Sequence, residues 1–170
     1  MTKRITISTL DAMKASGDKF VMITAYDATF ARLASEAGAE TILVGDSLGM
    51  VLQGHETTIP VSLDAMTYHT ECVARARPHS LIVADLPFMS FSNADDTLHA
   101  STRLMQAGAQ MVKLEGGTWL SDSIHRLVER GVPVCAHLGL TPQSVNVFGG
   151  YRVQGRTPKE AKSILADAVE

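Results

Sequence analysis

The sequence predicts an α/β fold with a parallel sheet, and two observations carry that prediction. Five short runs rich in β-branched and aliphatic residues alternate with longer segments of helical pattern. This alternation implies parallel pairing, because neighbouring parallel strands need a crossover connection. The runs are also apolar along nearly their whole length, which is typical of a sheet covered on both faces. Two architectures remain open, a doubly wound open sheet and a (β/α)8 barrel.

The expected strands are bounded by turn residues or by charged side chains. No GxGxxG motif follows the first of them, which weakens the case for a doubly wound dinucleotide-binding fold. In chain order the expected strands cover residues 20–25, 41–45, 81–84, 110–114 and 132–136.

Helical patterns between the strands begin at capping residues and end at glycine or before proline. We expect Ser8 or Thr9 to cap the first helix, which Gly17 ends, and Ser62 to cap the third. The expected helices cover residues 8–16, 28–37, 63–75, 94–107 and 119–130, and a last helix runs from about 158 to Glu170.

Length and composition favour a globular domain. The 170 residues are 45% hydrophobic, enough for a buried core, so we expect residues 1–170 to form one domain. The net charge of −3 comes from scattered basic and acidic residues, which argues against a nucleic-acid partner. Apolar runs are too short to span a membrane, so no membrane partner is expected.

The amino-terminal segment and the cysteines indicate a cytoplasmic protein. The first residues include basic side chains but no apolar core of a signal peptide, so none is expected. Cys72 and Cys135 show no metal-binding spacing and are expected to be unpaired thiols.

The end of each expected strand carries an ionisable residue. In a parallel α/β fold the carboxyl ends of the strands meet at one rim, where the sites of barrels and open sheets are built. The residues in question are Asp27, Asp46, Asp85, Glu115 and His137.

The acids at this rim differ in what else could explain them. Asp27 directly precedes a helix and is better explained as its N-cap. Asp46 is followed by a loop expected to run for roughly fifteen residues, and Asp85 by Leu-Pro-Phe, so neither is at an obvious cap. Converging carboxylates repel one another unless a cation holds them. Oxygen ligands without cysteine favour a hard ion, with magnesium the best candidate.

Two further residues and one loop extend this picture. Lys113 lies two residues before Glu115, on the same strand face, so it needs an anion: a neighbouring acid or a substrate carboxylate. For His137 a hydrogen-bonded core position and a place in the site are equally open. Residues 138–157 show little periodicity and are expected to form a long loop, either a lid or a subunit contact.

Several long motifs resemble the ketopantoate hydroxymethyltransferase (3-methyl-2-oxobutanoate hydroxymethyltransferase) family. The resemblance extends from about residue 5 to residue 156. The motifs are ITAYD (23–27), LVGDSLGMVLQGHETTIPV (43–61), ADLPF (84–88), MVKLEGG (111–117) and HLGLTPQSVNVFGGYRVQGR (137–156).

This resemblance implies a (β/α)8 TIM barrel of the phosphoenolpyruvate/pyruvate superfamily. It further implies a magnesium-dependent transferase that is a cytoplasmic homo-decamer. The implied reaction moves a hydroxymethyl group from 5,10-methylenetetrahydrofolate to the 2-oxo acid 3-methyl-2-oxobutanoate through a magnesium-stabilised enolate. Its product, ketopantoate, serves pantothenate biosynthesis.

The resemblance also assigns roles to residues of this sequence. It implies that Asp46 and Asp85 bind the metal directly and that Glu115 takes the third acidic position, through water. Substrate contacts are implied for Asp46, Ser47, Asp85 and Lys113, whereas Asp27 is left without a role.

Family chains are longer than this one, in line with barrels of about 250 residues. The resemblance therefore implies about the first five βα units, a barrel cut short on its C-terminal side. The catalytic base, a glutamate on the sixth strand, is expected beyond Glu170, so no catalytic residue is expected within 1–170. Two alternatives stay open: another magnesium-dependent 2-oxo-acid lyase or mutase of the superfamily, and a non-catalytic fragment.

Overall fold

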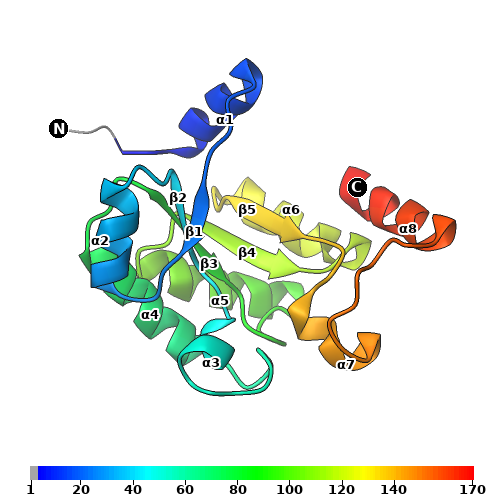
Figure 1. Cartoon of the computed structure of the whole chain (residues 1–170). Coiled ribbons are helices and arrows are strands. Elements are labelled where there is room, and N and C mark those ends of the chain that lie inside the picture. The colour runs from blue at the N-terminus through cyan, green and yellow to red at the C-terminus, as the bar shows by residue number, and fades with distance from the viewer. Residues whose placement is uncertain (1–3) are drawn as a thin grey trace.

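A computed structural model describes residues 4–170 and contains a five-stranded parallel sheet (Figure 1). The strands are hydrogen-bonded in chain order, β1-β2-β3-β4-β5, and every pair is parallel. All five expected strands are present, with ends shifted by a few residues. Their bounds are β1 Met22–Thr24, β2 Thr41–Val44, β3 Leu81–Asp85, β4 Met111–Glu115 and β5 Val134–His137.

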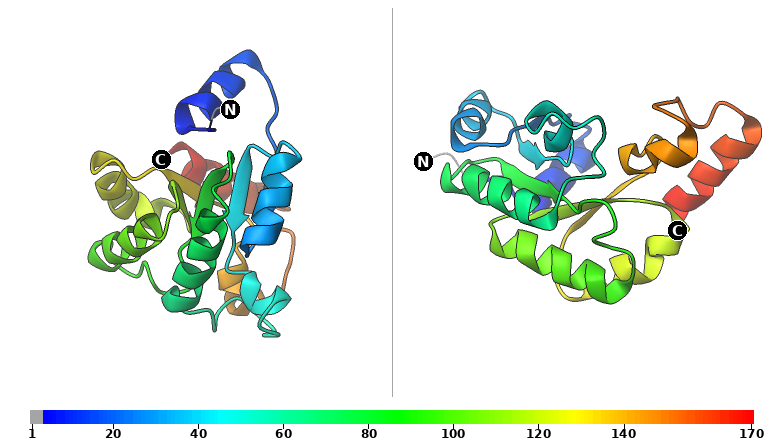
Figure 2. Two further views of the ribbon diagram at one scale, coloured as in Figure 1. Left: turned by 90° about the vertical axis from the view of Figure 1, so that its left-hand side faces the viewer. Right: turned by 90° about the horizontal axis from the view of Figure 1, so that it is seen from below.

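The strictly sequential strand order decides between the two expected architectures. A doubly wound sheet reverses its strand order and carries helices on both faces, whereas a (β/α)8 barrel adds each strand beside the last. Four helices pack in sequence, each against the next, along the outside of the strands (Figure 2). They are α2 Ala28–Glu36, α4 Leu63–Arg75, α5 Ala94–Gln106 and α6 Ser121–Glu129. The sheet is thus an arc of a (β/α)8 barrel, as expected.

Side-chain alternation divides the strands between a core and a site. Ile42 and Val44 on β2 are fully buried in the apolar core, together with Val112 and Leu114 on β4. Residues in alternate positions, such as Leu43, Lys113 and Glu115, belong to the opposite face and line a cavity there. The same period of two therefore builds the core and aims the polar side chains away from it.

The middle of the sheet is better covered than its edges. All five residues of β3 are buried, whereas Met22 and Ile23 on the edge strand β1 are 40% and 45% exposed. Strand β5 at the other edge is only partly buried. The arc thus has two edge strands that are unpaired on one side within residues 4–170.

The first helix begins earlier than expected. Helix α1 covers Ile7–Ser16 and is capped by Thr6, not by Ser8 or Thr9. Thr6 and Thr9 form a reciprocal capping box, which satisfies two backbone N–H groups at once and so outcompetes a later start. The expected stop at Gly17 is confirmed, since this residue takes a left-handed conformation. Figure 1 shows α1 standing away from the sheet.

Two segments expected to be irregular contain helical turns. Helix α3, Leu48–Val51, follows Asp46 almost directly, so the expected long loop is shorter than predicted. Residues 138–157 include the 3-10 turn η2 Pro142–Ser144 and helix α7 Val145–Phe148. Each turn is too short to show a helical period in the sequence, and for that reason the pattern missed both.

The remaining helices agree with expectation. Helix α4 has the predicted bounds and the predicted cap, because the Ser62 hydroxyl accepts from the Ala65 N–H. A 3-10 turn, η1 Thr118–Leu120, precedes α6, and helix α8 covers Pro158–Val169. The Asp167 carboxylate on α8 accepts from the N–H and hydroxyl of Thr118 at 2.9 and 2.8 Å, which docks α8 beside the end of β4.

The structure also bears on membrane-spanning helices and on the two cysteines. None of the helices that the structure describes is long and apolar enough to cross a membrane. Cys72 and Cys135 are both free thiols, as expected.

Asp27 caps helix α2. Its side chain accepts from the backbone N–H groups of Thr29 and Phe30 at 2.7 and 2.9 Å. The N-cap explanation is therefore confirmed, and Asp27 is separate from the acids that end β3 and β4.

We expect Asp27→Ala to lower the free energy of unfolding by about 1 kcal/mol, because it removes a helix N-cap. Urea titration followed by circular dichroism measures this loss. Asp11→Ala, at an exposed position within α1, is the matched control and should cause no such loss. Equal stability of the two variants would contradict the capping role.

Candidate functional site

A cavity of about 170 Å³ lies at the carboxyl ends of the strands. Every strand or the residue segment that follows it contributes to the lining, so the shared rim expected from the sequence exists. All six residues that the sequence singled out for chemistry meet here, and Asp27 does not. The lining consists of Thr24, Tyr26, Leu43, Gly45, Asp46, Ser47, Asp85, Lys113, Glu115, His137 and Pro142.

Asp46 and Asp85 form the buried centre of the site. Their exposed fractions are 1% and 4%. The backbone N–H of Asp46 donates to Oδ2 of Asp85 at 3.2 Å, which joins the end of β2 to the last residue of β3. Two carboxyl groups are thus held side by side in a part of the protein that water barely reaches.

Lys113 supplies a positive charge to this pair. Its Nζ donates to Oδ1 of Asp85 at 2.6 Å, so the neighbouring acid is its partner in this structure. Burial lowers the pKa of Lys113, but the charge and hydrogen bond of Asp85 outweigh it, and the pKa ends above its usual value. Lys113 is therefore a fixed ammonium group at the rim.

Glu115 has donors on both carboxylate oxygens. The ring nitrogen Nδ1 of His137 lies 3.1 Å from Oε1, and the backbone N–H of Gln143 donates to Oε2 at 2.9 Å. Glu115 is buried, whereas the His137 side chain is 32% exposed. His137 thus lies at the rim beside Glu115 and not in the apolar core.

Ser47 completes the predicted set. It follows Asp46, is half-buried and lines the cavity. It precedes helix α3, but its side chain does not cap that helix. Its hydroxyl is therefore not committed to the helix start.

Burial and the concentration of negative charge change the acidity of these groups. Burial, followed by the charge of Asp85, raises the pKa of Asp46 to about 7. Burial also raises the pKa of Asp85, although Lys113 opposes the shift. Three ionised carboxylates and one ammonium would leave two negative charges in a small cavity. Such an arrangement is costly unless a cation or protons balance it.

The donor set fits a hard divalent cation. Within residues 4–170 no three His, Cys, Asp or Glu side chains already surround a metal-sized position. Mg²⁺ does not require such a cage, since it commonly binds one or two carboxylates and keeps several waters. Asp46 and Asp85 supply two neighbouring carboxylates, and Glu115 lines the same cavity.

The sequence patterns missed two residues of the site. Tyr26 lines the cavity, and burial together with the charges of Asp85 and Asp46 raises its pKa. Gln143 is only 6% exposed and contacts two of the acids. Tyr26 directly precedes Asp27 in the ITAYD motif, which could have drawn attention to it. Gln143 lies in the motif of residues 137–156, but nothing there distinguishes it from the other polar residues of an irregular segment.

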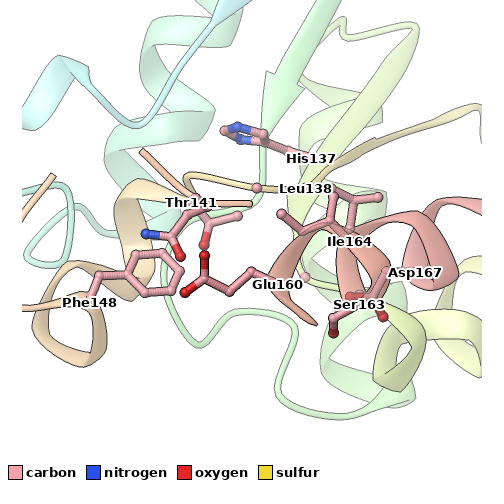
Figure 3. A pocket seen from close by; sticks show the side chains of 12 residues that line it. His137, Leu138, Thr141, Phe148, Glu160, Ser163, Ile164 and Asp167 are labelled. Carbon is pink, nitrogen blue, oxygen red and sulfur yellow. The ribbon is translucent and has the colours of Figure 1, made fainter. Parts of the chain in front are cut away.

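A second cavity, of about 220 Å³, adjoins the site beyond β5 (Figure 3). Thr141 and Phe148 line it from the segment after β5, and Glu160, Ile164 and Asp167 line it from α8. His137 lines this cavity as well as the carboxylate cavity, so the two meet at the end of β5.

Comparison of the sequence with known proteins gives a consistent result. A family model for ketopantoate hydroxymethyltransferase matches residues 4–170. The chain is 59% identical over 165 residues to 3-methyl-2-oxobutanoate hydroxymethyltransferase 2 of Pseudomonas aeruginosa, covering 97% of this chain and 62% of that protein. It is 60% identical over 164 residues to the Burkholderia vietnamiensis enzyme of that name, covering 96% of this chain and 60% of the relative. The chain therefore spans about 60% of the length of these relatives.

Solved structures of low sequence identity share the fold. A crystal structure of 2,3-dimethylmalate lyase, described as a PEP mutase/isocitrate lyase superfamily member, aligns with a TM-score of 0.66 at 14% identity and covers 99% of this chain and 60% of its own. Phosphonopyruvate hydrolase in complex with oxalate and Mg²⁺ aligns with a TM-score of 0.64 at 18% identity, covering 92% and 66% of the two chains. These likenesses show that the arc has the fold of part of such a barrel. Because the family model covers almost every residue, this chain belongs to the ketopantoate hydroxymethyltransferase family.

Proposed function

We propose that the whole protein carrying this chain is a hydroxymethyltransferase. It transfers a hydroxymethyl group from 5,10-methylenetetrahydrofolate to 3-methyl-2-oxobutanoate, and the product ketopantoate enters pantothenate biosynthesis. The observation that carries the proposal is the meeting of Asp46, Asp85, Lys113 and Glu115 in one cavity of a chain from this family. A cytoplasmic homo-decamer is the proposed form of the protein, on the family resemblance.

The proposed cofactor is Mg²⁺, held by Asp46 and Asp85 with Glu115 acting through water. When bound, Mg²⁺ supplies Lewis acidity, which polarises a keto group and stabilises the negative charge of an enolate. The two negative charges that remain on the rim after Lys113 is counted support a divalent ion.

The residues of the chain have separate tasks toward the 2-oxo acid. In the proposed complex Lys113 contacts the substrate carboxylate, and the Ser47 hydroxyl donates a hydrogen bond to a substrate oxygen. The ion pair with Asp85 holds the Lys113 ammonium in place before substrate arrives. His137 keeps Glu115 in a defined orientation. Proton removal from C3 falls to the glutamate that the family resemblance puts beyond Glu170.

The nearest rival is a magnesium-dependent 2-oxo-acid lyase or mutase of the same superfamily. The structural neighbours named above support this rival only through their fold, since their identities are below 20%. The relatives that are nearly 60% identical favour the transferase.

A cosubstrate omission assay of the whole protein separates the transferase from the lyase. We expect ketopantoate to form from 3-methyl-2-oxobutanoate only when methylenetetrahydrofolate and Mg²⁺ are both present. Turnover of a 2-oxo acid without the folate would reject the transferase in favour of a lyase or mutase.

We expect Asp46→Asn to weaken Mg²⁺ binding by at least about tenfold, because it removes a charged oxygen ligand without changing the side-chain volume. Isothermal titration calorimetry measures the affinity. Asp27→Asn is the matched control: asparagine also caps helices, so fold and Mg²⁺ affinity should both be retained. Equal affinities of the two variants would remove Asp46 from the metal site.

Lys113→Met in the whole protein distinguishes two roles of this lysine. If it contacts the substrate carboxylate, loss of a charge-assisted hydrogen bond worth about 1.5–3 kcal/mol lowers kcat/KM for the 2-oxo acid roughly ten- to a hundredfold. We expect this result with little change in Mg²⁺ affinity, since lysine is not a ligand. If Lys113 only neutralises Asp85, the variant would instead bind Mg²⁺ more tightly and keep its KM. Steady-state kinetics and Mg²⁺ titration of one variant decide between these outcomes.

A further inference from the structure

Gln143 connects three separate parts of the rim. It lies in the 3-10 turn η2 after β5, and only 6% of it is exposed. Its side-chain Nε2 donates to Oδ2 of Asp46 at 2.8 Å and to the carbonyl oxygen of Leu86 at 2.9 Å. Its backbone N–H donates to Oε2 of Glu115 at 2.9 Å. One residue thereby binds the segments that follow β2 and β3 and the last residue of β4.

The chemistry of the two side-chain partners fixes the orientation of the Gln143 amide. A carboxylate oxygen and a backbone carbonyl oxygen are both acceptors, so the amide group facing them must be the NH₂ and not the oxygen. Both amide protons are then in use, and the side chain has one satisfied arrangement. This makes Gln143 a rigid support rather than a mobile surface residue.

The hydrogen bond from Gln143 also divides the two oxygens of Asp46. Oδ2 is occupied by the Gln143 amide, whereas Oδ1 has no hydrogen-bond partner among residues 4–170. A ligand to a small cation needs a free oxygen and a fixed orientation, and residues that orient a ligand in this way affect metal affinity without touching the metal.

We infer that Gln143 is a positioning residue, which orients Asp46 for cation binding through Oδ1 and fastens the segment 138–157 to the rim. The inference rests on the proposed magnesium site for its first half only. The second half concerns how the segment after β5 is held, which is independent of any metal. The pattern of ionisable residues at the strand ends does not point to Gln143, because this residue is not ionisable and lies beyond the end of β5.

Gln143→Met tests the inference in the whole protein. Methionine is unbranched and similar in length, and it removes both side-chain donors while leaving the backbone N–H to Glu115. Gln154→Met is the matched control, because Gln154 lies in the same segment and, among residues 4–170, its side chain donates only to the carbonyl of Arg152. Gln143→Leu is a second uncharged variant that also lacks the NH₂ donor, for use if the methionine variant does not fold.

Two measurements are made on each variant. Calorimetric titration with Mg²⁺ should show a dissociation constant raised about 10- to 100-fold by Gln143→Met and unchanged by Gln154→Met. Hydrogen exchange followed by mass spectrometry, without metal, should show faster exchange in peptides covering 138–148 for Gln143→Met alone.

The outcomes separate this inference from the proposed function. Weaker Mg²⁺ binding together with faster exchange supports it in full. Wild-type protein that binds no Mg²⁺ would reject the proposed cofactor, and faster exchange would still support the fastening role. Unchanged exchange and unchanged Mg²⁺ affinity would overturn the inference. Faster exchange with unchanged affinity would overturn the orienting role.

Discussion

The rest of this site depends on the burial of two neighbouring carboxyl groups, Asp46 and Asp85. Each carboxylate, taken from water, costs free energy unless it is paired, and the charge of one adds to the cost of the other. Lys113 balances one of these charges. The Gln143 amide donates a hydrogen bond to Asp46, and the backbone N–H of Asp46 donates one to Asp85. Burial, followed by the charge of Asp85, raises the pKa of Asp46 to about 7. The proposed Mg²⁺ would balance the negative charge of these carboxylates.

The packing of the barrel arc offsets the free-energy cost of burying these carboxyl groups. Strands β2 and β3 are the best covered part of the sheet, and they carry Asp46 and Asp85 at or just beyond their carboxyl ends. The apolar core between these strands and the outer helices holds the two backbones in register. Of the residues of edge strand β1, by contrast, only Thr24 lines the cavity. Asp27, which follows this strand, caps helix α2. Rigid central strands thus bear the charges, and the less covered edges do not.

The segment after β5 contributes more than a cover. Its Gln143 binds Glu115 through the backbone N–H and Asp46 through the side chain, and His137, the last residue of β5, contacts the other oxygen of Glu115. A lid was one expectation for residues 138–157, and a subunit contact was the other. The hydrogen bonds show that at least η2 belongs to the rim itself. Its short turns arise because Pro142 sets the start of a 3-10 turn, and Gly149 in a left-handed conformation ends α7.

The sequence by itself determined the strand-helix alternation, the shared rim and most of its ionisable residues, because the carboxyl ends of parallel strands must lie on one side. It also separated Asp27 from Asp46, since only Asp27 directly precedes a long helix. The strand pattern left the barrel and the doubly wound sheet open, the family resemblance implied the barrel, and the strand order confirmed it. Only the tertiary structure decided the pairing of Lys113 with Asp85 and the place of Gln143. Gln143 and Asp46 are 97 residues apart, and their contact depends on how a whole arc of strands curves. Local patterns extend over one or two turns or strands, so they carry no information about such a contact.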